Sequence, residues 1–270
     1  MRLTWLVVLV TGLVTADRQR DRAALLAADQ AHARASDFLT AFADDATYLH
    51  PGAPLVRGKA AIRALLDSAA VGAVTWTPQY ADVSDDGSLG YTYGWTRLAD
   101  QQGKYLACWR RDGSGPWRVT AYARTRMAAG APPATAGEEP IAPTVRGRAD
   151  RHELLAADSA FAAMSVARGA KAAFLDFAAS EAVTLGPPAA PMNHGRDAIG
   201  ATFADFPADA VLEWAPVSAD VAGSGDLGCT VGEAKVLARQ WYSKYLTVWK
   251  RQAGGAWKFV ADGGNARPAP

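Results

Sequence analysis

Long phrases from the first half of this 270-residue sequence return, diverged but in the same order, in the second half. Three pairs of phrases carry the repeat: LLAAD (25–29) and LLAAD (154–158), VTWTPQYADVSDDGSLGYTYG (74–94) and LEWAPVSADVAGSGDLGCTVG (212–232), KYLACWRRDGSGPWRVTAY (104–122) and KYLTVWKRQAGGAWKFVAD (244–262). Self-similarity of this kind is the mark of duplicated structural units. The sequence therefore predicts two copies of one domain, at residues 21–126 and 150–265.

Each copy has the same predicted order of elements. In the first copy, apolar residues at helical spacing indicate one long or broken helix, followed by a short strand at Ala46–Leu49 and a second amphipathic helix, KAAIRALLDS, at 59–68. Four segments of alternating apolar and polar residues follow, with turns expected at Asp86-Gly87, Gln102-Gly103 and Gly113–Gly115. We expect an antiparallel meander with helices packed on it, which is an α+β arrangement.

The N-terminal stretch MRLTWLVVLVTGLVTA has the layout of a secretory signal peptide. A basic residue, Arg2, precedes an apolar run at Leu3–Val14, and small residues lead to a cleavage site at Ala16. The run is shorter than the roughly 20 residues that span a bilayer, although an uncleaved anchor is the alternative. We expect a periplasmic or secreted protein that has no membrane attachment once residues 1–16 are removed.

A second stretch without apolar periodicity separates the two copies. It is rich in Ala, Pro and Gly, and we interpret residues 127–149 as a linker. The net charge of +1 and the absence of a basic stripe argue against a nucleic-acid partner. Because no Cys/His cluster has ligand spacing and no nucleotide-binding motif is present, no metal and no cofactor are expected.

Only two cysteines are present, Cys108 and Cys229, at non-equivalent places in the two copies. An exported chain could oxidise them to a disulfide. Each lies within an apolar strand pattern, where a free cysteine usually packs as a small hydrophobic side chain. We therefore expect two free, buried cysteines.

One phrase in each copy points to a known family. The stretch ADDATYLHPGAPLVRGKAAI (43–62) and the pattern G(K/R)xAI at 58–62 and 195–199 resemble the nuclear transport factor 2 superfamily, also described as SnoaL-like or ketosteroid isomerase-like. The phrase TVWKRQAGGAWKFVADGGN (247–265) resembles an often secreted bacterial branch of it. The resemblance implies two cone-shaped α+β barrels with apolar cavities, paired sheet to sheet as an internal pseudo-dimer, with room for a homo-oligomer.

The resemblance also implies a candidate catalytic residue. In the isomerases of this superfamily the corresponding strand ends in an Asp-Pro whose carboxylate moves a proton, whereas this chain has His50-Pro51. A histidine has an unperturbed pKa of about 6.5, which suits proton transfer near neutral pH. The second copy has Gly186 in that place, so His50 could equally cap a strand or bind water at the cavity mouth.

Side chains on the expected inner face form the candidate ligand pocket. In the first copy these are Tyr48, Tyr91, Tyr93, Trp95 and Tyr105, and in the second copy they are Glu233 and Asp262. Glu233 could instead pair with Arg239, and Asp262 could anchor the last strand. The repeated acids Asp29 and Asp158 could face inward or lie in solvent.

Two functions fit these observations. The first is an exported module that binds a small apolar ligand or a partner through its cones. The second is an acid/base enzyme, of the isomerase, hydratase or cyclase type, that acts on an apolar carbonyl compound with His50 as base. No acidic partner for His50 is evident, because Ala107 stands near the place of the oxyanion-binding acid.

Overall fold

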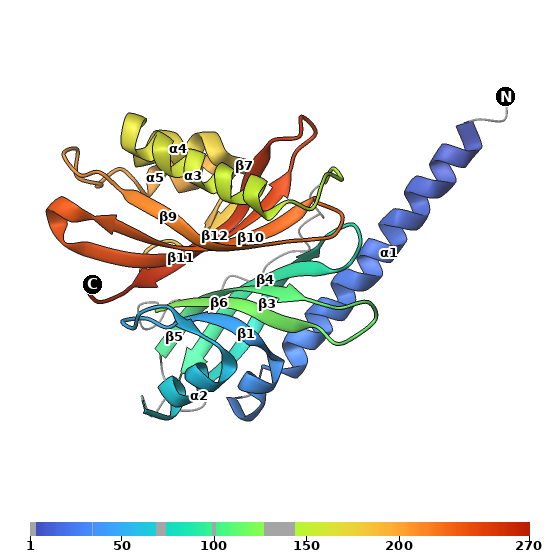
Figure 1. Ribbon diagram of the computed structural model, residues 1–270, viewed down its shortest axis with the longest axis horizontal. Coiled ribbons are helices and arrows are strands. Elements are labelled where there is room, and N and C mark those ends of the chain that lie inside the picture. The colour runs from blue at the N-terminus through green and yellow to red at the C-terminus, as the bar shows by residue number, and fades with distance from the viewer. Residues whose placement is uncertain (1–3, 34, 69–73, 99–100, 127–143) are drawn as a thin grey trace.

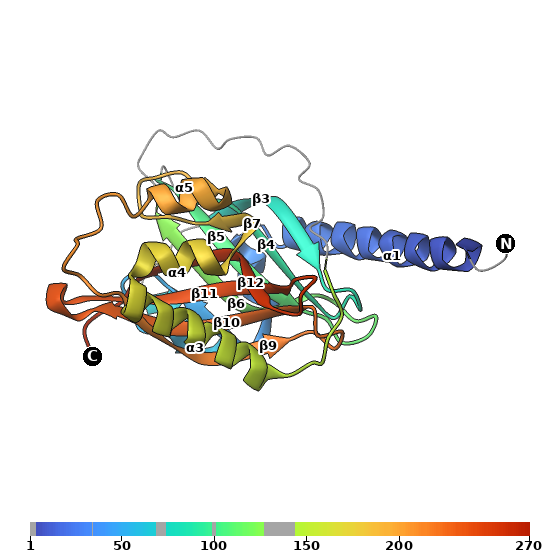
Figure 2. The same ribbon diagram turned by 90° about the horizontal axis from the view of Figure 1, so that it is seen from above.

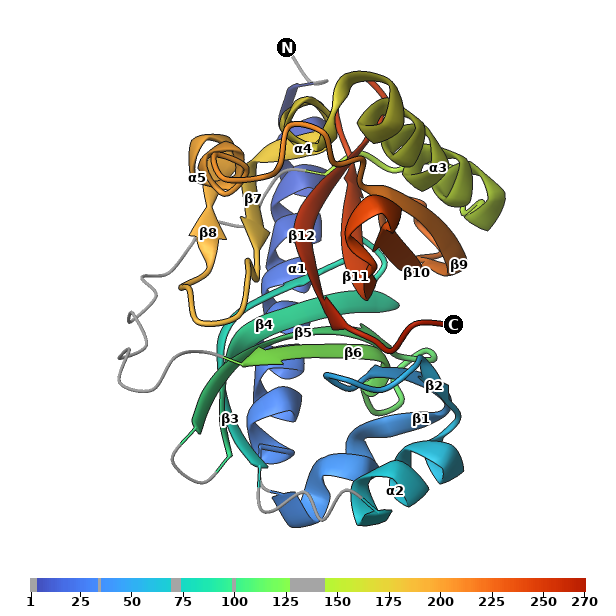
Figure 3. The ribbon, with the colours of Figure 1, turned by 90° about the vertical axis from the view of Figure 1, so that its left-hand side faces the viewer.

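The protein consists of two similar α+β halves packed sheet against sheet (Figure 1). The computed structural model describes residues 4–33, 35–68, 74–98, 101–126 and 144–270. Each half has a six-stranded mixed sheet, and apart from the long N-terminal helix the helices lie on the side that faces away from the other half (Figures 1 and 3). These are the two tandem cone-shaped α+β folds that the sequence predicts. Most of the predicted linker, residues 127–143, lies outside the described residues.

The first half begins with one continuous helix, which includes both the predicted cleavage site at Ala16 and the predicted start of the domain at residue 21. In chain order its elements are α1 (Thr4–Ala31), η1 (Ala35–Ala41), β1 (Phe42–Leu49), β2 (Val56–Arg57), α2 (Lys59–Ser68), β3 (Val74–Val83), β4 (Leu89–Leu98), β5 (Gln101–Arg110) and β6 (Arg118–Arg126). The turn expected at Gln102-Gly103 is wrong, because both residues lie within β5.

The second half repeats this order with a broken first helix. Its elements are α3 (Arg151–Arg168), α4 (Ala170–Phe177), β7 (Ala178–Thr184), β8 (Asn193–His194), α5 (Gly195–Ala201), β9 (Glu213–Val221), β10 (Leu227–Val236), η2 (Leu237–Arg239), β11 (Trp241–Arg251) and β12 (Trp257–Ala266). Asp150 caps α3 by accepting from the backbone N–H groups of His152 and Glu153. The break falls at Gly169, whose φ of 88° favours glycine.

Each sheet contains the expected antiparallel meander but is mixed as a whole. β3 to β6 do form an antiparallel meander, but the first strand adds parallel to the last, β1 beside β6 and β7 beside β12. Period-2 alternation reveals a strand but not its neighbour, since it reports only which side is buried. The parallel pairing brings the end of β7 beside Asp262 of β12.

The two sheets share one apolar core where they meet. Tyr91, Tyr93 and Cys108 of the first half belong to the same buried cluster as Cys229 and Val231 of the second. Cys108 and Cys229 form a disulfide with Cα atoms 6.6 Å apart, so the expectation of two free cysteines is wrong. Each cysteine is buried as expected, but the face it occupies is the one that meets the other half.

Ion pairs cross this interface in a reciprocal pattern. Lys250 of the second half lies 2.5 Å from Asp82 of the first, and Arg110 of the first half lies 3.4 Å from Asp220 of the second. Lys250 and Arg110 occupy matching places in the repeat, and so do the two aspartates. Residue i contacting j while j contacts i is the signature of a two-fold interface. The halves therefore form an internal pseudo-dimer.

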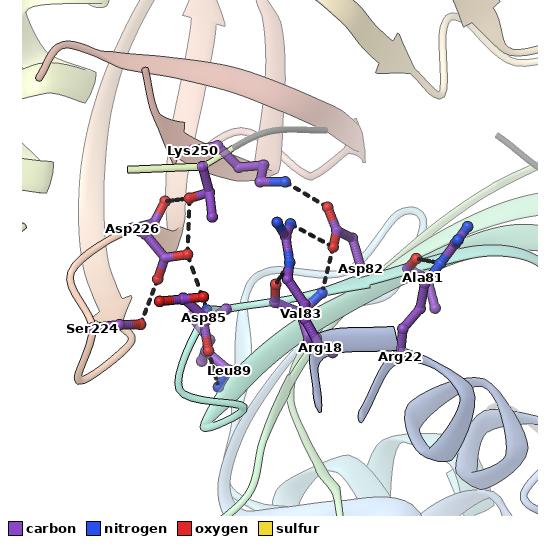
Figure 4. A network of polar contacts seen from close by, with 12 residues as sticks. Arg18, Arg22, Ala81, Asp82, Val83, Asp85, Leu89, Ser224, Asp226 and Lys250 are labelled. Carbon is purple, nitrogen blue, oxygen red and sulfur yellow. Dashed lines mark hydrogen bonds and ion pairs between the residues drawn. The ribbon is translucent and has the colours of Figure 1, made fainter. Parts of the chain in front are cut away.

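Helix α1 joins the same network. Arg18 Nη2 lies 2.8 Å from Asp82, and its Nε donates to the carbonyl of Val83, so that Asp82 receives cations from both α1 and β11 (Figure 4). Arg18, Asp82 and Lys250 are all buried. The N-terminal part of α1 extends away from the two sheets (Figures 1 and 2). Among the described helices, none combines the length and the apolar character needed to cross a bilayer.

Candidate functional site

The cone of the second half contains a cavity of about 520 Å³. Its walls include several aromatic side chains, among them Phe161, Phe174, Phe206 and Trp214. Trp241 lies in the lining and is 53% exposed, so the cavity reaches the surface beside it. A cavity of this size with predominantly apolar walls matches the usual dimensions of small-molecule sites.

A small group of polar side chains projects into the cavity from β11 and β12. Tyr245 and Thr247 are two residues apart on β11, so their side chains point to the same face of the sheet. Asp262 on β12 is the cross-strand neighbour of Thr247, whose Oγ1 donates to Asp262 Oδ2 at 2.6 Å. A second cavity of about 230 Å³ shares Asp262 and Phe174 with the first. Asp262 thus contributes to the lining of both cavities.

Asp158 of α3 adds a second carboxyl behind Tyr245. Tyr245 Oη lies 3.1 Å from Asp158 Oδ1, and Trp214 Nε1 donates to the same oxygen at 3.0 Å. Burial raises the pKa of Asp158 to about 6. Burial also raises the pKa of Asp262 to about 7, and the nearby charge of Asp158 adds to this rise. Carboxyls with raised pKa values in or directly behind a concave site are a common property of functional sites.

The first half keeps the buried acid but fills the cavity position. Asp29 accepts from Trp76 Nε1 and from Tyr105 Oη, each at 2.6 Å, as Asp158 does from its counterparts. Tyr122, the counterpart of Asp262, stacks on Tyr105 with ring centroids 5.5 Å apart. Tyr48, the counterpart of Thr184 in the second half, packs in the same ring cluster. The polar end that is open in the second cone is therefore occupied by rings in the first.

A loop at the mouth of the second cavity is held by the first half. Gly186, Pro187 and Pro188, between β7 and β8, line the cavity. Lys104 Nζ of β5 donates to the carbonyls of Pro187 and Ala190 at 3.0 and 2.6 Å. The counterpart of Lys104, Lys244, instead donates to Asn265 Oδ1 and Ala266 O within its own half. The mouth of the second cone thus depends on a side chain of the first.

His50 does not lie in this cavity. It follows β1, and its Nε2 lies 3.2 Å from Arg124 Nη2. Burial lowers the pKa of His50 to about 4, and the positive charge of Arg124 adds to this shift. An imidazole with so low a pKa is a weak proton acceptor near neutral pH. The geometry therefore gives no support to His50 as a catalytic base.

Four of the predicted pocket residues lie elsewhere, and this corrects the sequence interpretation. Tyr91 and Tyr93 are buried in the interface between the halves, and Trp95 packs against the same cluster. Glu233, which matches Trp95 in the repeat, forms an ion pair with Arg267 at 3.3 Å. The strand period placed these residues on one common face, but it could not show that this face meets the other half.

The remaining predicted residues face the cone interiors. Tyr48 and Tyr105 lie inside the first cone, and Asp262 lies at the polar end of the second cavity. The structure brings Asp262 together with Tyr245 and Thr247, which the sequence interpretation missed. The signal that could have found them is a difference within the repeat, since Thr247 and Asp262 replace Ala107 and Tyr122 together. Within the described residues, no cluster of His, Cys, Asp and Glu could hold a metal ion.

Comparisons with known proteins give similarity to solved structures alone. No family model and no curated protein matches the chain. A ketosteroid isomerase-like protein from Erwinia carotovora atroseptica is 16% identical with a TM-score of 0.35, and the match covers 43% of this chain and 93% of that one. An NTF2-like protein of unknown function from Pseudomonas putida is 18% identical with a TM-score of 0.37 (44% and 87% covered). ActVI-ORFA from Streptomyces coelicolor is 15% identical with a TM-score of 0.34 (43% and 95% covered).

Proposed function

We propose that the second half binds a small, largely apolar molecule in its cone and that the first half serves as a scaffold for it. The observation that carries this proposal is the cavity of about 520 Å³, with aromatic walls and one polar end at Asp262. Specific ligand sites commonly combine apolar walls with a few placed polar groups. In the first half, rings occupy the corresponding place, which supports a division of labour between the two copies.

The function is tested by giving the second cone the residues of the first. Thr247→Ala combined with Asp262→Tyr places a ring where the first half has Tyr122. The wild type should bind the neutral dye Nile red, with an increase in fluorescence, and the double variant should lose this binding. Tyr122→Phe, a change inside the first cone, is the matched control and should leave dye binding unchanged. Equal binding by the wild type and the double variant would contradict a site in the second cone.

Mass spectrometry under native conditions gives an independent test. Protein purified from its own host should carry a retained small molecule, and the double variant should not. A wild-type protein that carries no molecule and takes up no dye would contradict the proposal.

Proton transfer is a second candidate function, and one observation favours it. The pKa of Asp262, raised to about 7, suits a general base or acid that works near neutral pH. In this second function, Asp262 and not His50 is the base, and the cavity binds an apolar carbonyl compound. Exchange of α-hydrogens of a bound ketone with deuterated water, lost in Asp262→Asn, would favour catalysis over binding alone.

We further propose that the protein is exported and that residues 1–16 are its signal peptide. The layout of Arg2, Leu3–Val14 and Ala16 supports this proposal. The disulfide between Cys108 and Cys229 also supports it, because such bonds persist mainly in oxidising compartments. N-terminal sequencing of the protein from its host should give Asp17 as the first residue. A mature chain that starts at Met1 would refute the proposed cleavage.

A further inference from the structure

The polar end of the second cavity offers more hydrogen-bond acceptors than donors. Thr247 Oγ1 already donates to Asp262 Oδ2, and the phenol of Tyr245 already lies within hydrogen-bond distance of Asp158. Asn265 Nδ2 gives its two hydrogen bonds to carbonyls of the first half, those of Leu49 and Arg124. A ligand that reaches this end therefore meets the carboxyl group of Asp262, and it must supply a hydrogen-bond donor of its own.

The same end also lacks a balancing positive charge. Among the described residues, no lysine or arginine forms an ion pair with Asp158 or Asp262. Two lysines line the cavity, and each has partners other than these carboxyls: Lys244 donates to Asn265 Oδ1 and Ala266 O, and Lys235 forms an ion pair with Glu213 at 3.4 Å. Asp82, by contrast, is buried with Lys250 at 2.5 Å and Arg18 at 2.8 Å. This chain thus pairs a buried carboxylate with cations at its interface but leaves Asp262 at the cavity, and Asp158 buried behind Tyr245, without such partners.

We propose that the ligand of the second cone is an apolar amine whose protonated nitrogen binds at Asp262, with the rest of the molecule against the aromatic wall. This inference rests on the proposed function and names the class of its ligand. An ammonium group supplies only donors, and its charge offsets that of the Asp262 carboxylate. Aromatic faces such as that of Trp214 in the lining also attract cations. A carbonyl or carboxylate end would meet acceptors and negative charge.

The test uses two probes of matched shape, 4-phenylbutylamine and 4-phenylbutan-1-ol. An aliphatic amine stays protonated near pH 7.5, because its pKa is close to that of lysine. In calorimetric titrations of the full-length protein at this pH, the amine should bind the wild type at least about tenfold more tightly than the alcohol. Asp262→Asn should reduce this preference to within about twofold. Asp209→Asn, which removes one exposed carboxylate that pairs with Arg239, controls for net charge and should keep the preference.

A second measurement keeps the inference testable if Asp262→Asn does not fold. The carboxyl carbon of Asp262 is followed by NMR as a function of pH in the wild type. Bound amine should lower the pKa of Asp262, and the alcohol should not. Equal affinity for both probes, or an unchanged pKa with amine bound, overturns the amine assignment and leaves the binding function standing. Nile red binding without binding of either probe also overturns it, and absence of all three overturns the proposed function itself.

Discussion

Replacing Asp262 with Asn should make the protein more stable at pH 8 than the wild type. Burial raises the pKa of Asp262 from 3.8 to about 7 in the folded state. A carboxyl with a raised folded pKa favours folding fully below pH 3.8, and this contribution is lost as the pH rises to about 7. One pKa unit corresponds to about 1.4 kcal/mol, so the full loss is on the order of 4 kcal/mol.

The amide substitution removes this dependence but keeps the local contact, since the oxygen of Asn can still accept from Thr247. At pH 4 the two proteins should have similar free energies of unfolding. At pH 8 the variant should exceed the wild type by about 2–4 kcal/mol, because some of the penalty is relieved where Asp262 meets the cavity. Urea unfolding followed by circular dichroism at pH 4, 6 and 8 measures the difference.

The contribution of Asp262 to the pH dependence of stability must be distinguished from that of the titratable groups around it. Asp158 of α3 titrates in the same range, and Lys244 and Tyr245 of β11 line the same cavity. All three are present in both proteins, so the difference between wild type and variant isolates Asp262 to a first approximation. Asp209→Asn is the surface control and should leave the pH dependence unchanged. Parallel pH curves for wild type and Asp262→Asn, or a variant less stable at pH 8, would refute the reasoning.

Three further predictions concern the joint between the halves. Lys104→Met removes two hydrogen bonds to the mouth loop and should weaken Nile red binding about three- to tenfold by fluorescence titration; unchanged affinity would show that the loop does not need this lysine. Cys229→Ser removes the only disulfide between the described halves, and this disulfide joins residues that are 121 positions apart in the sequence. The substitution should lower the free energy of unfolding by about 3–5 kcal/mol. Reductant should reproduce that loss in the wild type and have no effect on the variant. Asp82→Asn leaves Lys250 buried without its carboxylate and should cost about 3–5 kcal/mol in urea unfolding, whereas a loss below about 1 kcal/mol would mean that the pair is not desolvated.

The architecture could be predicted from the sequence because the duplication and the hydrophobic periods agree with each other. Period-2 alternation located the meander, and the repeated phrases fixed the two copies. The parallel addition of β1 to β6 could not be found in this way, since the pairing of strands distant in sequence leaves no local pattern. For the same reason, the sequence around Tyr91 and Cys108 could not show that these side chains lie on the face of the sheet that contacts the second half.

Asp262 and His50, both candidates from the sequence, differ in where the structure places them. Asp262 was selected because it is an acid on an inward-facing strand, and it does line the cavity. His50 was selected by family position, but its burial, together with the charge of Arg124, which is distant in sequence, lowers its pKa to about 4. Comparing the two copies residue by residue would have been more informative, since Thr247 and Asp262 change together relative to the first copy.

The exchange of loop contacts between the halves limits how this protein can be divided. The backbone N–H of Ala189, in the mouth loop of the second cone, donates to the carbonyl of Arg126 at the end of β6. Gly52, in the matching loop of the first cone, donates to the carbonyl of Ala266 at the end of β12. Each rim is therefore completed by the last strand of the other copy. A single excised copy would have an unfinished rim, so ligand studies on this protein require both copies in one chain.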